Sequence, residues 1–111
     1  MSASRFAKTP EPPYFAVIFT SQRTDGDHGY GKTADRMMEL ASQQPGYLGA
    51  ESARDPSGLG ITVSYWSTLE AIAQWKTNGE HLDAQAEGKR SWYSHLEVRV
   101  CKVERAYRFG R

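Results

Sequence analysis

The sequence of 111 residues contains a single cysteine, Cys101, and three histidines. One cysteine cannot form an intrachain disulfide, and no Cys/His spacing is typical of a structural zinc site. No two-His-one-carboxylate spacing stands out among His28, His81 and His95, so no metal is expected. These absences favour a location in the reducing cytoplasm.

The sequence also lacks a predominant charge of one sign, a long apolar run and a Gly-rich phosphate loop. Lys and Arg number 14 and Asp and Glu number 13, which gives a net charge of +1. Proteins that bind nucleic acid phosphates usually carry a clear positive excess, so nucleic acid is not an expected partner. Nowhere do about 18 apolar residues run together, so no membrane segment is expected. No nucleotide cofactor is implied.

What the chain does contain is bulky apolar material, with 3 Trp, 6 Tyr and 4 Phe. The length suits one domain, expected over residues 13–111. Residues 1–12 are interpreted as a flexible N-terminal arm. Prolines at positions 10, 12 and 13 disfavour a helix there and cannot donate to a sheet.

The distribution of apolar residues predicts alternating strands and helices. Residues 14–21 are β-branched and aromatic, which is typical of a buried strand, and the polar turn formers of residues 24–29 follow. From Tyr30 the apolar positions recur with helical spacing until Pro45-Gly46. Residues 46–54 and 61–66 are expected to pair as an antiparallel hairpin.

The second half repeats the pattern of helix and strand. Ser67 and Glu70 are spaced as a capping box, which predicts a helix directly after Trp66. Asn78-Gly79 interrupts it, and a further helical piece is expected over residues 80–93. Residues 96–109 are expected to form a long final strand. Its apolar alternation changes phase near Cys101, which suggests a β-bulge or a face that exchanges one neighbour for another midway.

The resulting order, strand, helix, strand, strand, helix, strand, predicts an α+β fold of ferredoxin-like βαββαβ type with an antiparallel sheet. Residues 15, 17 and 19 make one face of the first strand apolar, and residues 14, 16 and 18 do the same for the other. Helices can cover only one face of such a sheet. A second copy of the chain is expected on the other face, which predicts a homodimer.

Several segments resemble the antibiotic biosynthesis monooxygenase family over roughly residues 14–109. They are Gly46-Tyr47-Leu48-Gly49, the run from Ser64 to Ala71, the positions Trp75, His81, Ala84, Gly88 and Trp92-Tyr93, and the run from Val103 to Tyr107. The resemblance implies a dimeric α+β barrel. It also implies one of the family's activities, which include cofactor-independent oxygenation of aromatics and haem degradation, although many members have no known activity.

The haem-degrading branch of the family can be compared position by position. Its members carry a second tryptophan about nine residues beyond the strand tryptophan and a haem-ligating histidine about nineteen beyond it. Trp66 and Trp75 match the two tryptophans. Gln85 stands near the ligand position, and His81 lies about one helical turn away. This departure argues against haem as a cofactor, and no cofactor is expected.

His81 is the candidate catalytic residue, because its unperturbed pKa near 6.5 suits a proton acceptor near neutrality. With Ala84, Gln85, Gly88 and Trp92 it falls on one predicted helix face. The alternative role for His81 is to cover the start of this helix after the Asn78-Gly79 break.

Aromatic and hydroxyl side chains complete the candidate site. Trp66, Trp75 and Trp92 could form a wall for a planar ligand, or could simply belong to the core. Tyr65, Tyr93 and Ser21 are further candidates as hydroxyl donors to a substrate.

The leading hypothesis is therefore a cofactor-independent monooxygenase that acts on a small electron-rich aromatic such as a phenol, a hydroquinone or a polyketide-like compound. A dry pocket, a base and hydrogen-bond donors would suffice for that chemistry. The alternative is a non-catalytic dimeric module for ligand binding or assembly. A haem-degrading enzyme ranks below both.

Overall fold

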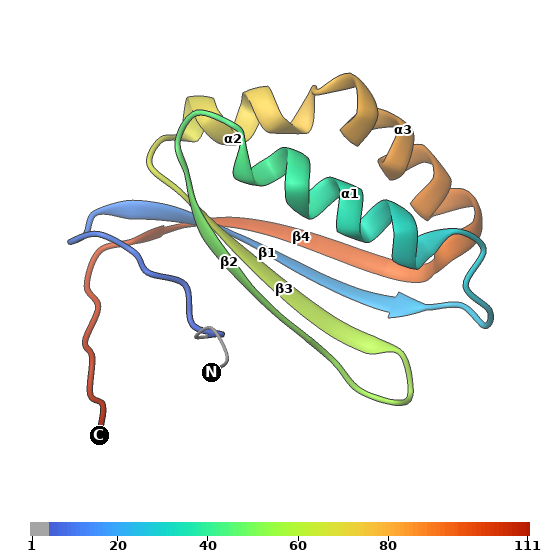
Figure 1. The fold of residues 1–111 in the computed structure, drawn as a ribbon, viewed down its shortest axis with the longest axis horizontal. Coiled ribbons are helices and arrows are strands. Elements are labelled where there is room, and N and C mark those ends of the chain that lie inside the picture. Colours follow the sequence, from blue (N-terminus) through green and yellow to red (C-terminus); the bar gives the residue numbers. More distant parts are fainter. Residues whose placement is uncertain (1–4) are drawn as a thin grey trace.

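The strands and helices follow the expected order in a computed structural model, which describes residues 5–111 (Figure 1). The elements are β1 (Tyr14–Arg23), α1 (Tyr30–Ser42), β2 (Tyr47–Arg54), β3 (Leu59–Trp66), α2 (Leu69–Lys76), α3 (Gly79–Glu87), the π-helical turn η1 (Gly88–Trp92) and β4 (Tyr93–Val103). They form one sheet with the strand order β2-β3-β1-β4, in which every pair is antiparallel. This confirms the predicted ferredoxin-like α+β fold.

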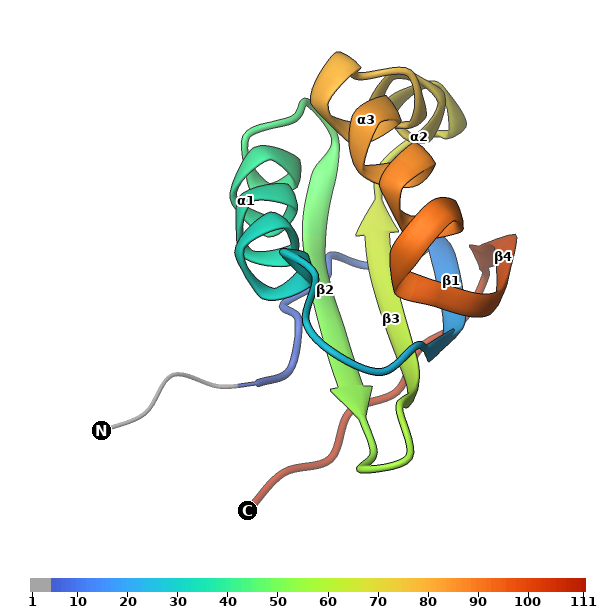
Figure 2. The ribbon, with the colours of Figure 1, turned by 90° about the vertical axis from the view of Figure 1, so that its right-hand side faces the viewer.

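All helices lie on one face of the sheet (Figure 1). Viewed along the sheet, α1 covers the β2 side, while α2 and α3 lie toward β1 and β4 (Figure 2). The alternation along β1 decides which side chains face the helices. Phe15 pairs with Trp66, whose ring stacks on Trp75 of α2, so Phe15, Val17, Phe19 and Ser21 point toward the helices.

The opposite face of the sheet, called the open face here, has no helix over it. It carries Tyr14, Ala16 and Ile18 of β1 with Leu59, Ile61, Val63 and Tyr65 of β3. Leu59 and Ile61 are each 47% exposed. Near one corner, the Ala7 backbone N–H donates to Glu51 Oε2 at 3.0 Å, which holds this part of the N-terminal segment against β2. Among residues 5–111, no helix is both long and apolar enough to cross a membrane.

The start of α2 differs from the prediction by one residue. Thr68 is the N-cap, and its Oγ1 accepts a hydrogen bond from the Ala71 N–H at 3.0 Å. The expected capping box of Ser67 and Glu70 is wrong. The Ser67 N–H donates to the Gly46 carbonyl at 2.8 Å, which holds Ser67 beside the residue that precedes β2. The helix therefore begins only at Leu69.

The final strand also differs from the prediction. β4 ends at Val103 rather than Phe109, and its pairing with β1 is continuous from Leu96 to Val103. The expected bulge near Cys101 is wrong, because the pairing is unbroken there. The apolar side chains instead pass from the helix side of the strand, up to Val100, to the open face from Cys101 on, which is the exchange of faces expected as the alternative. Pairing ends at Tyr14 because the prolines at positions 12 and 13 have no N–H to offer a longer partner.

Gly46 is required where α1 turns into β2. Its φ is +85°, and a Cβ there would lie 2.7 Å from the Ala71 Cβ. Gly29 has a similar φ of +82°, but no atom lies within 4 Å of its virtual Cβ. Alanine substitutions at the two glycines therefore separate two effects. A side chain at either position costs about 1–2 kcal/mol because of the positive φ, and only the one at Gly46 also adds a clash.

We expect Gly46→Ala to lower the free energy of unfolding by clearly more than Gly29→Ala, since only the first adds a clash with α2. Urea denaturation of the two variants measures the difference. Equal losses would contradict the close packing of this turn against Ala71.

Candidate functional site

Three of the predicted site residues form a column of stacked rings on the helix side of the sheet. Trp66, at the end of β3, has no exposed surface, and its ring centroid lies 6.4 Å from that of Trp75 with 25° between the planes. The Trp75 ring in turn stacks on His81, with centroids 4.2 Å apart and planes 15° apart. The column thus leads from the sheet, through α2, to the start of α3.

The break between α2 and α3 places His81 at the end of this column. Asn78 is the N-cap of α3, and its Oδ1 accepts a hydrogen bond from the His81 N–H at 3.2 Å. The His81 Nδ1 lies 2.8 Å from the Trp75 carbonyl oxygen. A carbonyl oxygen only accepts, so Nδ1 carries a proton and donates this bond.

The second ring nitrogen of His81 has the properties of a proton acceptor. Burial lowers the pKa of His81 below its ordinary 6.5, although the hydrogen bond to Trp75 opposes this shift. The neutral ring, with its proton on Nδ1, leaves a lone pair on Nε2. Within residues 5–111, no hydrogen bond engages Nε2.

The sheet beneath the helices is apolar but not fully covered. Val17 and Phe19 lie in the central strand and face the helices, yet each is only partly buried. Val98 and Val100 face the same side from the edge strand β4 and are each 52% exposed. The helices thus leave part of an apolar floor accessible, which suits a flat, apolar ligand.

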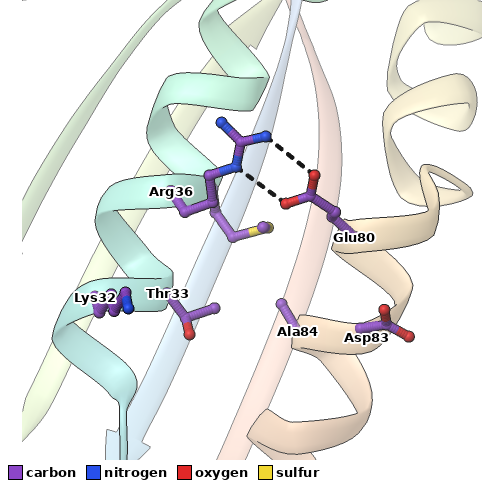
Figure 3. A pocket seen from close by; sticks show the side chains of 7 residues that line it. Lys32, Thr33, Arg36, Glu80, Asp83 and Ala84 are labelled. Atoms are coloured by element: carbon purple, nitrogen blue, oxygen red, sulfur yellow. Dashed lines mark hydrogen bonds and ion pairs between the residues drawn. The ribbon is translucent and has the colours of Figure 1, made fainter.

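A hollow of about 320 Å³ opens between α1 and α3. Arg36 and Glu80 face each other across it and form a bidentate ion pair, with two N–O distances of 3.0 Å (Figure 3). Ala84 lines this hollow, whereas Gln85 turns away and donates to the Lys76 carbonyl at 3.0 Å. The residues of α3 that are predicted to share one face therefore point in two directions. Ala84 faces α1, whereas His81 and Gln85 contact α2.

Ser21 and Tyr93 lie in a second cluster at the other end of β1. Six residues separate Phe15 from Ser21, which corresponds to about 20 Å along the strand. Ser21 is only 1% exposed, and its Oγ accepts a hydrogen bond from Arg54 Nη2 at 2.8 Å. Tyr93 packs edge-on against Phe19 and Tyr30, with centroids 5.4 and 5.9 Å apart.

Trp92 and Tyr65 lie apart from the ring column. Trp92 is 5% exposed, and its Nε1 donates to the His28 carbonyl at 2.8 Å, which ties the loop before α1 to η1. Tyr65 lies on the open face, where its hydroxyl donates to Glu51 Oε1 at 2.6 Å. The structure therefore brings together Trp66, Trp75 and His81 of the predicted site, and separately Ser21 and Tyr93, with Trp92 joined to Tyr93 through the Tyr30 ring.

Sequence reasoning missed the arginine of the second cluster. Arg54 ends β2 directly before a turn, a place where a charged residue usually faces solvent. The only local signal is Gly60, opposite Arg54 in the hairpin, which leaves room for a large side chain. That signal cannot be interpreted without knowing the pairing register.

Comparisons with known proteins agree with this fold. The family model for antibiotic biosynthesis monooxygenases matches residues 13–87. The chain belongs to the antibiotic biosynthesis monooxygenase family. YqjZ of Bacillus subtilis (strain 168), described as an uncharacterized protein, is 54% identical over 99 residues, which are 89% of this chain and 87% of that protein.

Solved structures share the fold at low sequence identity. SnoaB from Streptomyces nogalater, described as a cofactor-independent oxygenase, superposes with a TM-score of 0.72 at 11% identity, over 86% of this chain and 97% of SnoaB. PA3566 from Pseudomonas aeruginosa has a TM-score of 0.68 at 13% identity, over 88% and 99% of the two chains. These likenesses extend over nearly the whole domain.

We expect His81 to titrate below pH 6.5 in the folded protein and near 6.5 in concentrated urea. The folded pKa is depressed, so the stability that the neutral ring contributes is present above pH 6.5 and is lost as the pH falls through the folded pKa. An NMR titration of the ring protons measures both values. A folded pKa at or above the urea value would contradict the desolvated environment described for His81.

Proposed function

We propose that the protein is a cofactor-independent monooxygenase of a small electron-rich aromatic, with His81 as the general base. The observation that carries the proposal is the ring column, in which the Trp75 carbonyl holds Nδ1–H and leaves Nε2 as a base. Trp75, which is only partly buried, offers an apolar ring edge beside it, and the fully buried Trp66 supports Trp75 from the core. Such a site can hold an aromatic ring and remove its proton in one place.

The proposed reaction balances without an external reductant. For an anthrone, His81 Nε2 accepts a proton from the methylene carbon, and the resulting anion transfers electrons to dioxygen. A carbon–oxygen bond forms, the oxygen–oxygen bond then breaks, and one oxygen leaves as water while the other stays as the new ketone. The substrate loses two hydrogens and gains one oxygen atom. The depressed pKa of His81 keeps the base unprotonated at neutral pH.

The family and the fold support this chemistry. SnoaB has the same fold and is described as a cofactor-independent oxygenase. YqjZ is much more similar to this chain in sequence than SnoaB is, but it is described as uncharacterized, so it suggests no substrate. We place the protein in the cytoplasm, because Cys101 is exposed and has no disulfide partner.

We expect the wild-type protein to consume oxygen with a panel of anthrones and hydroquinones, and His81→Asn to lower the rate by at least about 10²-fold, the usual contribution of a general base. An oxygen electrode measures the rate. His95→Asn, on the exposed edge strand, is the matched control and should keep it. The proposal fails if no substrate gives a wild-type rate above the His81→Asn background.

A non-catalytic ligand-binding module is the alternative function. It is favoured by one feature of the site: within residues 5–111, no carboxylate forms an ion pair with His81 to stabilise its protonated form. Saturable binding of an anthrone, without oxygen consumption and without proton release, would establish this alternative.

We also propose that the protein is a homodimer joined through its open faces. Leu59 and Ile61 are about half exposed there, beside Ile18 and Val63, which gives the two central strands an apolar surface. Full burial of one such side chain contributes about 1.5–3 kcal/mol. A symmetric pair would bury this surface on both copies of the chain at once, which favours a closed two-fold dimer.

We expect light scattering to return a mass of about twice the 12.5 kDa of the chain. Ile61→Asp places a charge in the open face and should produce monomers. Val98→Asp, at a similar exposure on the helix side of the sheet, should leave the dimer intact. A stable, folded wild-type monomer at micromolar concentration would refute the dimer.

A further inference from the structure

The cluster around Ser21 holds two guanidinium groups beneath the N-terminus of α1. The Arg23 Cζ lies 3.7 Å from the centroid of the Tyr30 ring, and the Arg54 Cζ lies 5.8 Å from it. Tyr30 is fixed from other directions by edge contacts with Trp92 and Tyr93. Both arginines are partly buried. The two guanidinium groups are therefore held against a tyrosine ring that is itself fixed by other aromatic side chains.

The sheet makes specific room for Arg54. A Cβ on Gly60 would lie 2.5 Å from the Arg54 Cζ, so the guanidinium lies directly on the backbone of β3. Its Nη1 donates to the carbonyls of Ser21 and Gly58, and its Nη2 donates to Ser21 Oγ. These bonds fix the plane of the guanidinium, and within residues 5–111 its Nε–H and one Nη2–H have no hydrogen-bond partner.

Neither of these charges is neutralised by the chain itself. Within residues 5–111, every ion pair involves other basic groups, and the partners of Arg23 and Arg54 are backbone carbonyls, a serine hydroxyl and an aromatic ring. Partly buried charges are normally paired, because removing a charge from water is costly. Two such cations without a carboxylate favour an anion from outside.

A hollow of about 260 Å³ adjoins the cluster at Tyr93. Lys89 and His95 also line it, and no acidic residue does. Burial, followed by the neighbouring Tyr30, raises the pKa of Tyr93, so its phenol stays protonated and can donate a hydrogen bond. Apart from Leu96, an anion entering this hollow would meet basic and hydroxyl groups.

We propose that this cluster is a binding site for the carboxylate of a small aromatic acid, with Arg54 and Tyr93 as its donors. A planar guanidinium matches the two oxygens of a carboxylate, and Phe19, Tyr30 and Tyr93 offer apolar surface to the ring that carries it. The site lies at the opposite end of β1 from His81. It therefore does not depend on the oxygenase proposal, and either can fail without the other.

The test uses benzoate as the probe and benzamide as its neutral control of similar size and shape. In the wild-type protein labelled with ¹⁵N, benzoate should shift the Nε–Hε signal of Arg54 saturably, and benzamide should not. Arg54→Gln should weaken benzoate binding at least tenfold, and Tyr93→Phe severalfold. Arg105→Gln, which removes an exposed guanidinium outside the sheet, should leave the affinity within twofold.

Equal shifts with benzoate and benzamide, or parallel shifts of Arg54 and Arg105, would overturn the proposal. So would unchanged affinity in folded Arg54→Gln. Because Arg54 also holds Ser21, the wild-type titration stands as a test if that variant does not fold. His81→Asn should bind benzoate like the wild type, which separates this site from the oxygenase proposal.

Discussion

The packing of Trp66 is the interaction on which the rest of this domain depends. Its ring lies where three strands meet the helices, opposite Phe15 of β1 and edge-on to Tyr47 of β2, with centroids 5.4 Å apart in the second pair. It also stacks on Trp75, and its Nε1–H is satisfied by Ser64 Oγ at 2.9 Å. Losing a buried tryptophan of this kind costs about 3–5 kcal/mol, a large fraction of the stability of a small domain.

That packing also determines where chemistry can occur. By fixing Trp75, Trp66 fixes the carbonyl that orients His81, so the tautomer of the proposed base follows from the core. The helices meet the sheet at this column and at the Tyr30 cluster near its other end. Between the two contacts, the floor around Val17 and Phe19 stays partly accessible. One sheet thus carries the proposed base near one end and fixed positive charge at the other.

Much of this arrangement could be predicted from the sequence, because it depends on local patterns. The β-branched and aromatic residues of β1 and the helical spacing from Tyr30 predict the element order, and the two-sided apolar character of β1 predicts a sheet with one face left open. Trp66 and Trp75 are predicted as site residues because aromatic side chains can form a wall for a planar ligand. The predicted start of α2 is wrong by one residue, because the Ser67 N–H donates to the carbonyl of Gly46, which is distant in sequence.

The features that could not be predicted all depend on pairing register. Tyr65 and Trp66 are adjacent in sequence, yet the pleat places them on opposite faces of the sheet. Arg54 becomes part of an interior cluster only because β2 and β3 pair so that Gly60 lies opposite it. His81 was predicted to share a helix face with Ala84, but the Asn78 cap turns His81 toward α2 while Ala84 lines the hollow beside α1.

The central claim is that an aromatic substrate lies against the ring column within reach of His81 Nε2. A crystal structure of the protein with a hydroquinone, grown without oxygen, tests this most directly. The account predicts the hydroquinone on the helix side of the sheet, with one hydroxyl at hydrogen-bond distance, about 2.6–3.2 Å, from Nε2. A hydroquinone bound on the open face, or a protein group already bonded to Nε2, would contradict it.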